Sequence, residues 1–123
     1  MTTQEIADRL VELSRQGKSE QAYKELFADD AVAIEPMGPD GPGPVKTQGL
    51  DNLLAKSKEF EKSVIELHSS SASDPIVAGN HFACTMVLDA TMKEMGRMKM
   101  EEICLYEVKD GKIASEQFFY SMG

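Results

Sequence analysis

The chain has 123 residues, which fits one domain spanning residues 1–123, and a chain of this size buries about two thirds of its unfolded surface without disulfide or metal staples. A net charge of −8 and the absence of basic runs exclude a phosphate backbone or an anionic membrane as partner. Charged residues interrupt the first segment and no run approaches about 18 apolar residues, so we expect neither a signal peptide nor a membrane span, and a cytoplasmic protein.

The N-terminal segment has the pattern of two amphipathic helices. Thr2 and Glu5 have the spacing of a capping box, and apolar residues then recur at helical intervals, which predicts a helix over residues 3–16. Ser19 is a suitable cap for a second helix, which is expected to stop around residues 28–30.

A short strand, a loop and a third helix are expected next. The run 31–35 predicts a strand that ends at Pro36, because proline cannot continue a β-ladder. Residues 36–49 contain four prolines and four glycines, which predicts an irregular loop beside a pocket or a dimer interface. An apolar stripe then predicts a third helix over about residues 50–62.

The second half of the chain has the pattern of an antiparallel sheet. Alternating and β-favouring residues predict strands over residues 64–71, 76–77, 81–93, 98–108 and 113–120. The last two runs are joined by Lys109, Asp110 and Gly111, and an Asp-Gly step between such runs is a strong hairpin signal.

Four segments of the chain carry a family resemblance: FADDA (27–31), IEPMG (34–38), YEVKDGKI (106–113) and FFY (118–120). Together with the order of elements, they resemble the nuclear-transport-factor-2-like superfamily, which includes ketosteroid isomerases and SnoaL-like polyketide cyclases. The resemblance implies an α+β, cone-shaped, barrel-like fold, in which a strongly curved antiparallel sheet wraps around about three N-terminal helices.

The resemblance also implies the position of a catalytic base. In the isomerases this base is an acidic residue directly before a proline at the end of the strand after the ADDA-like segment, and Glu35 stands there in this chain. Those enzymes stabilise the enolate with a tyrosine and a protonated aspartic acid, where this chain has Leu10 and Cys104. The base is kept and the oxyanion hole is not, so we do not expect ordinary steroid isomerisation.

Turn geometry predicts which strand residues face the expected pocket. A two-residue turn at Met95-Gly96 places Val87 opposite Cys104, and a bulge at Gly111 places Cys104 opposite Glu116. The pocket face then holds Thr85, Val87, Asp89, Met100, Glu102, Cys104, Tyr106, Glu116, Phe118 and Tyr120.

The opposite face of these strands is predicted to form a homodimer interface. An apolar patch of this kind would make a monomer prone to association, and it consists of Met86, Leu88, Ile103 and Leu105. The same register separates Cys84 from Cys104, so we expect reduced thiols and no internal disulfide. A one-residue slip in either turn would exchange the faces.

Acidic residues are predicted to converge on the pocket. Carboxylates crowded in a low dielectric cannot all ionise, so the pKa of at least one should be raised. Ionised Glu35 would then be the base, and protonated Glu102 or Glu116 would donate to the substrate oxygen. Alternatively, the acids pair with Arg97, Lys99 or Lys112, or lie in water. The candidate ligand-binding residues are Tyr23, Phe27, Phe60, Val87, Asp89, Cys104, Tyr106, Phe118 and Tyr120.

The sequence therefore predicts a protein that binds a small, largely apolar, carbonyl-bearing molecule. Isomerisation or cyclisation by proton transfer through Glu35 is one interpretation, and a non-catalytic ligand-binding or dimerisation module of the same fold is the other. No metal-ligand spacing and no phosphate-binding glycine loop is present, so we expect no metal and no cofactor.

Overall fold

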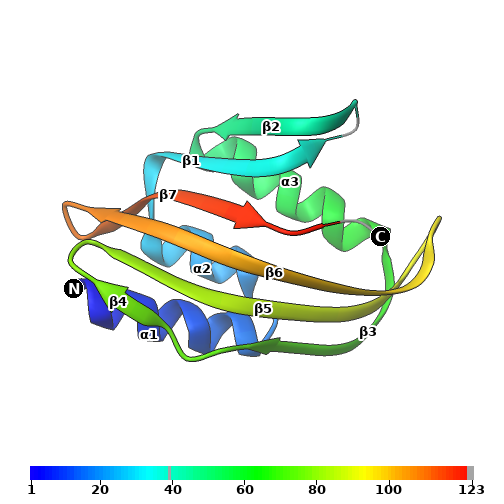
Figure 1. Ribbon diagram of the computed structural model, residues 1–123, viewed down its shortest axis with the longest axis horizontal. Coiled ribbons are helices and arrows are strands. Elements are labelled where there is room, and N and C mark those ends of the chain that lie inside the picture. Colours follow the sequence, from blue (N-terminus) through cyan, green and yellow to red (C-terminus); the bar gives the residue numbers. More distant parts are fainter. Residues whose placement is uncertain (39, 122–123) are drawn as a thin grey trace.

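The computed structural model describes residues 1–38 and 40–121, in which three helices cover one face of a curved, seven-stranded sheet (Figure 1). The helices are α1 (Thr3–Arg15), α2 (Ser19–Leu26) and α3 (Leu50–Ser63). The strands are β1 (Phe27–Gly38), β2 (Gly41–Gln48), β3 (Val64–Ala72), β4 (Ile76–Ala78), β5 (His81–Met92), β6 (Gly96–Lys109) and β7 (Lys112–Phe119). No helix in this part of the chain is long and apolar enough to cross a membrane.

The N-terminal helices begin as local hydrogen bonding dictates. The Glu5 amide donates to the Thr2 hydroxyl, and the Thr2 amide donates to the Glu5 carboxylate, so the predicted capping box is confirmed. The capping position of α2 is held by Lys18 without a side-chain bond, so the prediction that Ser19 caps this helix is wrong. Ser19 is instead the first helical residue, and its hydroxyl lies 3.4 Å from that of Ser57 on α3.

The strands form one open sheet in the order β2-β1-β7-β6-β5-β3, with β4 also paired to β5. The predicted α+β, cone-shaped fold is confirmed, although the sheet is mixed because β1 runs parallel to β7. Its two ends, β2 and β3, do not pair with each other within the described residues, so the sheet curves without closing into a barrel.

The proline- and glycine-rich segment is part of the sheet, contrary to the predicted loop. β1 continues past Pro36 to Gly38 and pairs with β2, with a register shift between Glu35 and Met37. Because β2 is an edge strand, one side of it has no neighbouring strand. The missing N–H of each proline in β2 can face that side without leaving a ladder partner unpaired. The strand therefore carries Glu35 in its interior instead of ending at it.

The register between β5 and β6 differs from the predicted one. The connecting turn has three residues, 93–95, followed by Gly96 with a φ of 73°, and this turn places Cys84 opposite Cys104. The slip from Val87 to Cys84 is an odd number of residues, so β5 presents the opposite set of side chains to the helices. The predicted faces of β5 are therefore exchanged, and the two cysteines share one face.

The hairpin between β6 and β7 is tighter than predicted. Lys109 lies opposite Lys112, and both turn residues have positive φ, 52° at Asp110 and 75° at Gly111, which is typical of a two-residue type I′ turn. Cys104 lies opposite Phe118 and not Glu116. This shift is an even number of residues, so the predicted faces of β6 and β7 are retained.

Replacing Gly111 with alanine should destabilise the protein by about 1–2 kcal/mol, because an L side chain resists the left-handed conformation that this turn requires. Asp110→Asn is the matched control, since asparagine tolerates that conformation. Urea unfolding of both variants tests this, and equal stability of the alanine variant and the parent would show that the turn does not hold this conformation.

Candidate functional site

Three carboxyl side chains meet on the helix-facing, or inner, face of the sheet. Ala33 of β1 is the register partner of Glu116 on β7, so Glu35, two residues further along, shares the side of Glu116. Glu116 lies opposite Tyr106 on β6, and Glu102 points to the same side as Tyr106. The sequence predicted that four acids, Asp89 among them, converge on the pocket. The structure places Glu35, Glu102 and Glu116 on one face of the sheet and Asp89 on the other.

Glu116 lies at the buried end of this cluster, with 2% of its surface exposed. Its carboxyl accepts a 2.6 Å hydrogen bond from the hydroxyl of Tyr23 on α2. Burial raises the pKa of Glu116 to about 8, and the negative charges of Glu102 and Glu35 add to the increase, while the Tyr23 bond opposes it. Glu116 is therefore mostly protonated at neutral pH.

Glu35 lies at the more exposed end, where its side chain is 25% exposed. One carboxylate oxygen is 2.7 Å from the ammonium of Lys56 on α3, and the other accepts a 3.1 Å hydrogen bond from the Tyr120 hydroxyl. Burial and the adjacent Glu35 charge raise the pKa of Tyr120 to about 12, so this hydroxyl remains a donor. The ion pair with Lys56 requires Glu35 in its carboxylate form.

Glu102 lies on the same inner face and is half-buried. Burial raises its pKa, and the charge of Glu35 contributes in the same direction, while contact with the Cys104 thiol opposes the shift. Within the described residues, Lys56 is the only cation in an ion pair with any of the three acids. The cluster thus combines a carboxylate in an ion pair with two carboxyls whose pKa values are raised.

Several predicted ligand-binding residues form the core beneath the acids. Phe27, Cys104 and Tyr106 are almost completely buried, and Phe27 lies edge-on to Tyr106 with ring centroids 6.4 Å apart. Phe82 of β5 stacks on the other side of Tyr106 at 4.7 Å. The sequence reasoning missed Phe82, although its alternation with Cys84 indicated that the two share a face.

The paired thiols are part of this packed base. The contact with Cys84 and burial both raise the pKa of Cys104, so Cys104 stays protonated, and both cysteines are free. The predicted absence of a disulfide holds in this structure, but the predicted reason, separation onto opposite faces, is wrong.

Beyond the aromatic stack, the inner face of β5, β6 and β7 is covered unevenly. Ala90 and Met92, near the β5–β6 turn, are buried. Other apolar side chains of this face are half-buried: Met86, Leu88, Met98, Met100 and Phe118. Tyr120 is likewise half-buried, and Phe60 on α3 is 42% exposed. This Met-rich region adjoins Glu102, which is the register partner of Met86.

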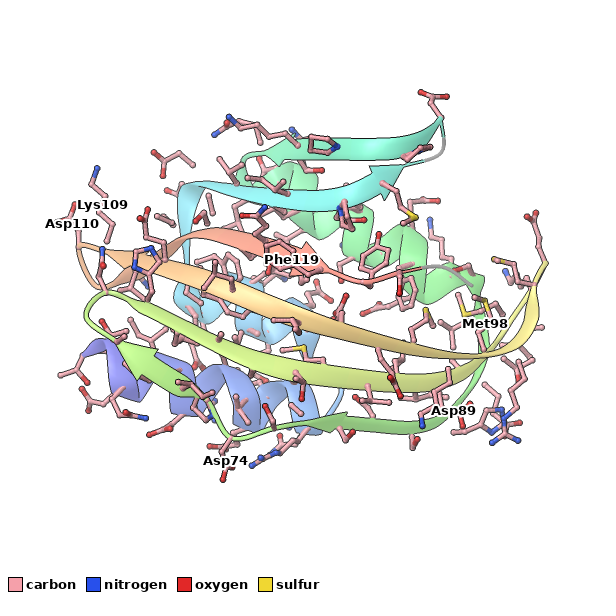
Figure 2. The ribbon with its side chains drawn as sticks, in the orientation of Figure 1. Asp74, Asp89, Met98, Lys109, Asp110 and Phe119 are labelled. Atoms are coloured by element: carbon pink, nitrogen blue, oxygen red, sulfur yellow. The ribbon has the colours of Figure 1, made fainter. Side chains whose placement is uncertain are left out.

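Val87 and Asp89 lie on the outer face and away from the acids, so their assignment to the pocket is wrong. The exchanged register of β5 is the reason, since Val87 lies opposite Glu101 and Asp89 opposite Lys99. Figure 2 shows Asp89 towards the end of the sheet that carries the β5–β6 turn. Asp89 accepts two hydrogen bonds from the guanidinium of Arg97. This contact agrees with the alternative interpretation, in which the acids pair with basic residues such as Arg97. Met86 and Leu88, assigned to the dimer interface, lie on the inner face for the same reason.

Two open hollows lie elsewhere on the described surface. One is beside α2 at Glu20 and Lys24, and the other lies between α1 and the β3–β4 connection at Arg15 and Asp74. Neither includes a carboxyl of the cluster.

The burial of Glu116 should make the stability of the protein depend on pH. A carboxyl whose folded pKa of about 8 exceeds its unfolded value of 4.5 holds its proton more tightly in the folded state, so the free energy of unfolding should fall as pH rises between these values. Glu116→Gln, whose amide oxygen can still accept from Tyr23, should weaken this fall by an amount on the order of a few kcal/mol.

Urea unfolding between pH 5 and about 8 measures this difference. Glu101→Gln, which changes an exposed carboxyl on the neighbouring strand β6, is the control and should retain the parental pH dependence. Parallel curves for the parent and Glu116→Gln would contradict the assignment of a neutral buried Glu116.

Known proteins share both the sequence pattern and the fold. Residues 1–120 match the family model of the SnoaL-like domain. A protein from Mesorhizobium loti, proposed to be a SnoaL-like polyketide cyclase, is 38% identical, with 98% of this chain and 100% of that chain covered and a TM-score of 0.88. A comparison with curated proteins found no match.

More distant structures share the fold alone. A protein of unknown function with a cystatin-like fold from Xanthomonas campestris is 18% identical with a TM-score of 0.80, over 99% of this chain and 92% of that chain. IdmH from Streptomyces antibioticus, a proposed polyketide cyclase, is 18% identical with a TM-score of 0.72, over 97% and 91%. The match over residues 1–120 and the 38% identity together show that this chain belongs to the SnoaL-like domain family.

Proposed function

We propose that this protein binds a small, largely apolar, carbonyl-bearing molecule on the Met-rich inner face and moves a proton on it, as an isomerase or cyclase. The observation that carries the proposal is the pair of carboxyls in opposite states: Glu35 is a paired carboxylate, whereas Glu116 is buried and mostly neutral at pH 7. An ionised carboxylate and a neutral carboxyl provide an acceptor and a donor of protons in one site.

Glu35 is the better candidate for the base. Its carboxylate is partly exposed, so a substrate C–H bond can approach it, and Tyr120 orients it through a hydrogen bond. Glu102 and Glu116 are the candidates for donating a hydrogen bond to the substrate oxygen. The half-buried exposure of Glu102 makes it the more accessible of the two, while Glu116 is covered by Tyr23.

The apolar part of the substrate would lie on the thioether and aliphatic side chains beside Glu102. Methionine side chains adapt to irregular apolar shapes, and this surface is left half-buried by the chain itself. The family and the cyclases proposed among its structural neighbours support a substrate whose acidic carbon lies next to a carbonyl group, as in a polyketide.

A second candidate function, a ligand-binding module without catalysis, is favoured by one feature of the site. Glu35 is already neutralised by Lys56, and Phe27, Phe82 and Tyr106 fill the space beneath the acids. A carboxylate bound to an ammonium is a weaker base than a free one. Catalysis therefore requires the substrate to alter this ion pair.

The substitution Glu35→Gln separates the two functions. With β-tetralone, an apolar ketone with an acidic CH₂ group, the parent should catalyse exchange of that hydrogen in D₂O. The variant should lose about 10²–10⁴-fold of the rate because a positioned base is removed. Exchange is followed by proton NMR and binding by thermal shift.

The exposed carboxyl of Glu101 provides the control, and Glu101→Gln should exchange β-tetralone at the parental rate. Binding without exchange in the parent, or equal exchange in the parent and Glu35→Gln, would leave only the non-catalytic module.

We also infer that two copies of the chain meet through the outer face of the sheet. Ile103 and Phe119 are register partners on that face, and they are 52% and 46% exposed. Leu105 and Val87 lie on the same side, so apolar side chains from β5, β6 and β7 adjoin one another there. An apolar patch of this kind favours association.

Replacing Ile103 with glutamate should convert a dimer into a monomer, because the carboxylate would lose water on association without gaining a partner. Sedimentation velocity of the parent and the variant measures the change. Thr85→Glu, at the register partner of Ile103, places a charge within the same patch and should have the same effect. A parent that sediments as a monomer across a concentration series would rule out this interface.

A further inference from the structure

Lys56 is placed to act on the same molecule as Glu35. It lies in the middle of α3, three residues after the buried Leu53, so it points to the side of the helix that faces the sheet. Its ammonium lies 2.7 Å from a Glu35 oxygen and 3.3 Å from the Thr47 hydroxyl of β2. The ammonium can donate three hydrogen bonds, and these two contacts leave one for another acceptor.

The side chain of Lys56 is exposed enough to change partner. It is 43% exposed, and its four-carbon stem can move without displacing the helix. The charge of Lys56 also acts inside the site. The pKa of Glu116 is set mainly by burial, then by Tyr23, Glu102 and Glu35, and the cation of Lys56 lowers it to a smaller extent. Lys56 is therefore directed toward the cluster and not only toward solvent.

A site that forms an enolate needs hydrogen-bond donors or positive charge near the substrate oxygen. The described part of the cluster has three carboxyls, and only Lys56 among its cations forms an ion pair with any of them. An ammonium beside a developing oxyanion stabilises the transition state more than the neutral ground state. The hydroxyls of Tyr23 and Tyr120 already donate to Glu116 and Glu35.

We propose that Lys56 is a catalytic residue that exchanges its contact with Glu35 for the carbonyl oxygen of the substrate. This inference rests on the proposed function and assigns the group that completes it. The exchange has two effects: the ammonium binds the oxygen that becomes negative, and Glu35 is released from the cation that weakens it as a base. The substrate class that fits is a ketone with an acidic hydrogen on the carbon next to the carbonyl.

The proton and the electrons balance within the site. Glu35 takes the proton from the carbon, the C–H electron pair forms the new C=C bond, and the carbonyl π electrons move to the oxygen held by Lys56. Protonated Glu35 then returns the proton to carbon, at the same atom in simple exchange or at a conjugated atom in isomerisation. Neither an oxidant nor a reductant is needed.

Substitutions at Lys56 test the proposal through β-tetralone exchange. Lys56→Met should lower the rate about 10²–10³-fold, as the loss of an oxyanion-stabilising group does. Lys56→Arg, which keeps the charge, should retain part of the rate. Lys62→Met is the matched control, because Lys62 lies on the same helix and pairs only with the exposed Glu59. If Lys56 merely neutralises Glu35, Lys56→Met would exchange at the parental rate or faster, and the proposal would be overturned.

A binding measurement gives a second readout that needs no turnover. β-Naphthol, whose ionised form mimics an enolate, is titrated into Glu35→Gln, and its ionisation is read from its absorbance and emission. Lys56 should favour the bound naphtholate, and Glu35→Gln/Lys56→Met should hold the neutral form. Equal ionisation in both proteins, or no binding to Glu35→Gln, would overturn the proposal.

The two measurements separate the failure of this inference from that of the proposed function. Exchange that is lost in Glu35→Gln but unchanged in Lys56→Met supports the base and removes Lys56 from the mechanism. Naphtholate binding that depends on Lys56, in a protein without exchange, supports Lys56 as the anion-binding group and removes the proposed catalysis.

Discussion

The pairing of β5 with β6, which sets Cys84 opposite Cys104, is the constraint on which the site depends. Successive side chains of a strand point to opposite faces, so this one register decides which residues meet the helices. It brings Phe82 onto Tyr106 and leaves Glu102 beside Met86 on the inner face. The aromatic stack then fills the space below the acids, which is why Glu116 is buried.

The element boundaries followed from periodicity, whereas the register did not. Helical spacing and the capping box located α1, and alternation located β5, because these signals are local to the segment. The register of β5 depended on whether the turn before β6 contains two residues or three, and Gly96 suits either arrangement. The structure resolves that ambiguity through packing, since the three-residue turn buries Phe82 and Cys84 under the helices.

The acidic residues of the site could be predicted, but their partners could not. Glu35 has a signature in its own segment, an acid directly before proline. Glu116 lies two residues before Phe118 in a recognisable strand, so the two side chains share a face. Lys56 has no such signature, because a lysine on a helix surface usually faces water. Only the docking of α3 against β1 brings its ammonium to Glu35, and that placement depends on contacts distant in sequence. The β1–β2 hairpin was missed for a related reason, since prolines exclude a central strand and not an edge strand.

The electrostatics of the cluster follow from the depth at which each acid lies. An ionised Glu116 would place a charge under Tyr23 with no cation in contact, so the neutral form, which still accepts the tyrosine bond, costs less free energy. Glu35 is partly exposed, and its carboxylate lies 2.7 Å from the ammonium of Lys56. Glu102 is half-buried, and a ligand that excludes water would further raise its pKa and strengthen it as a hydrogen-bond donor.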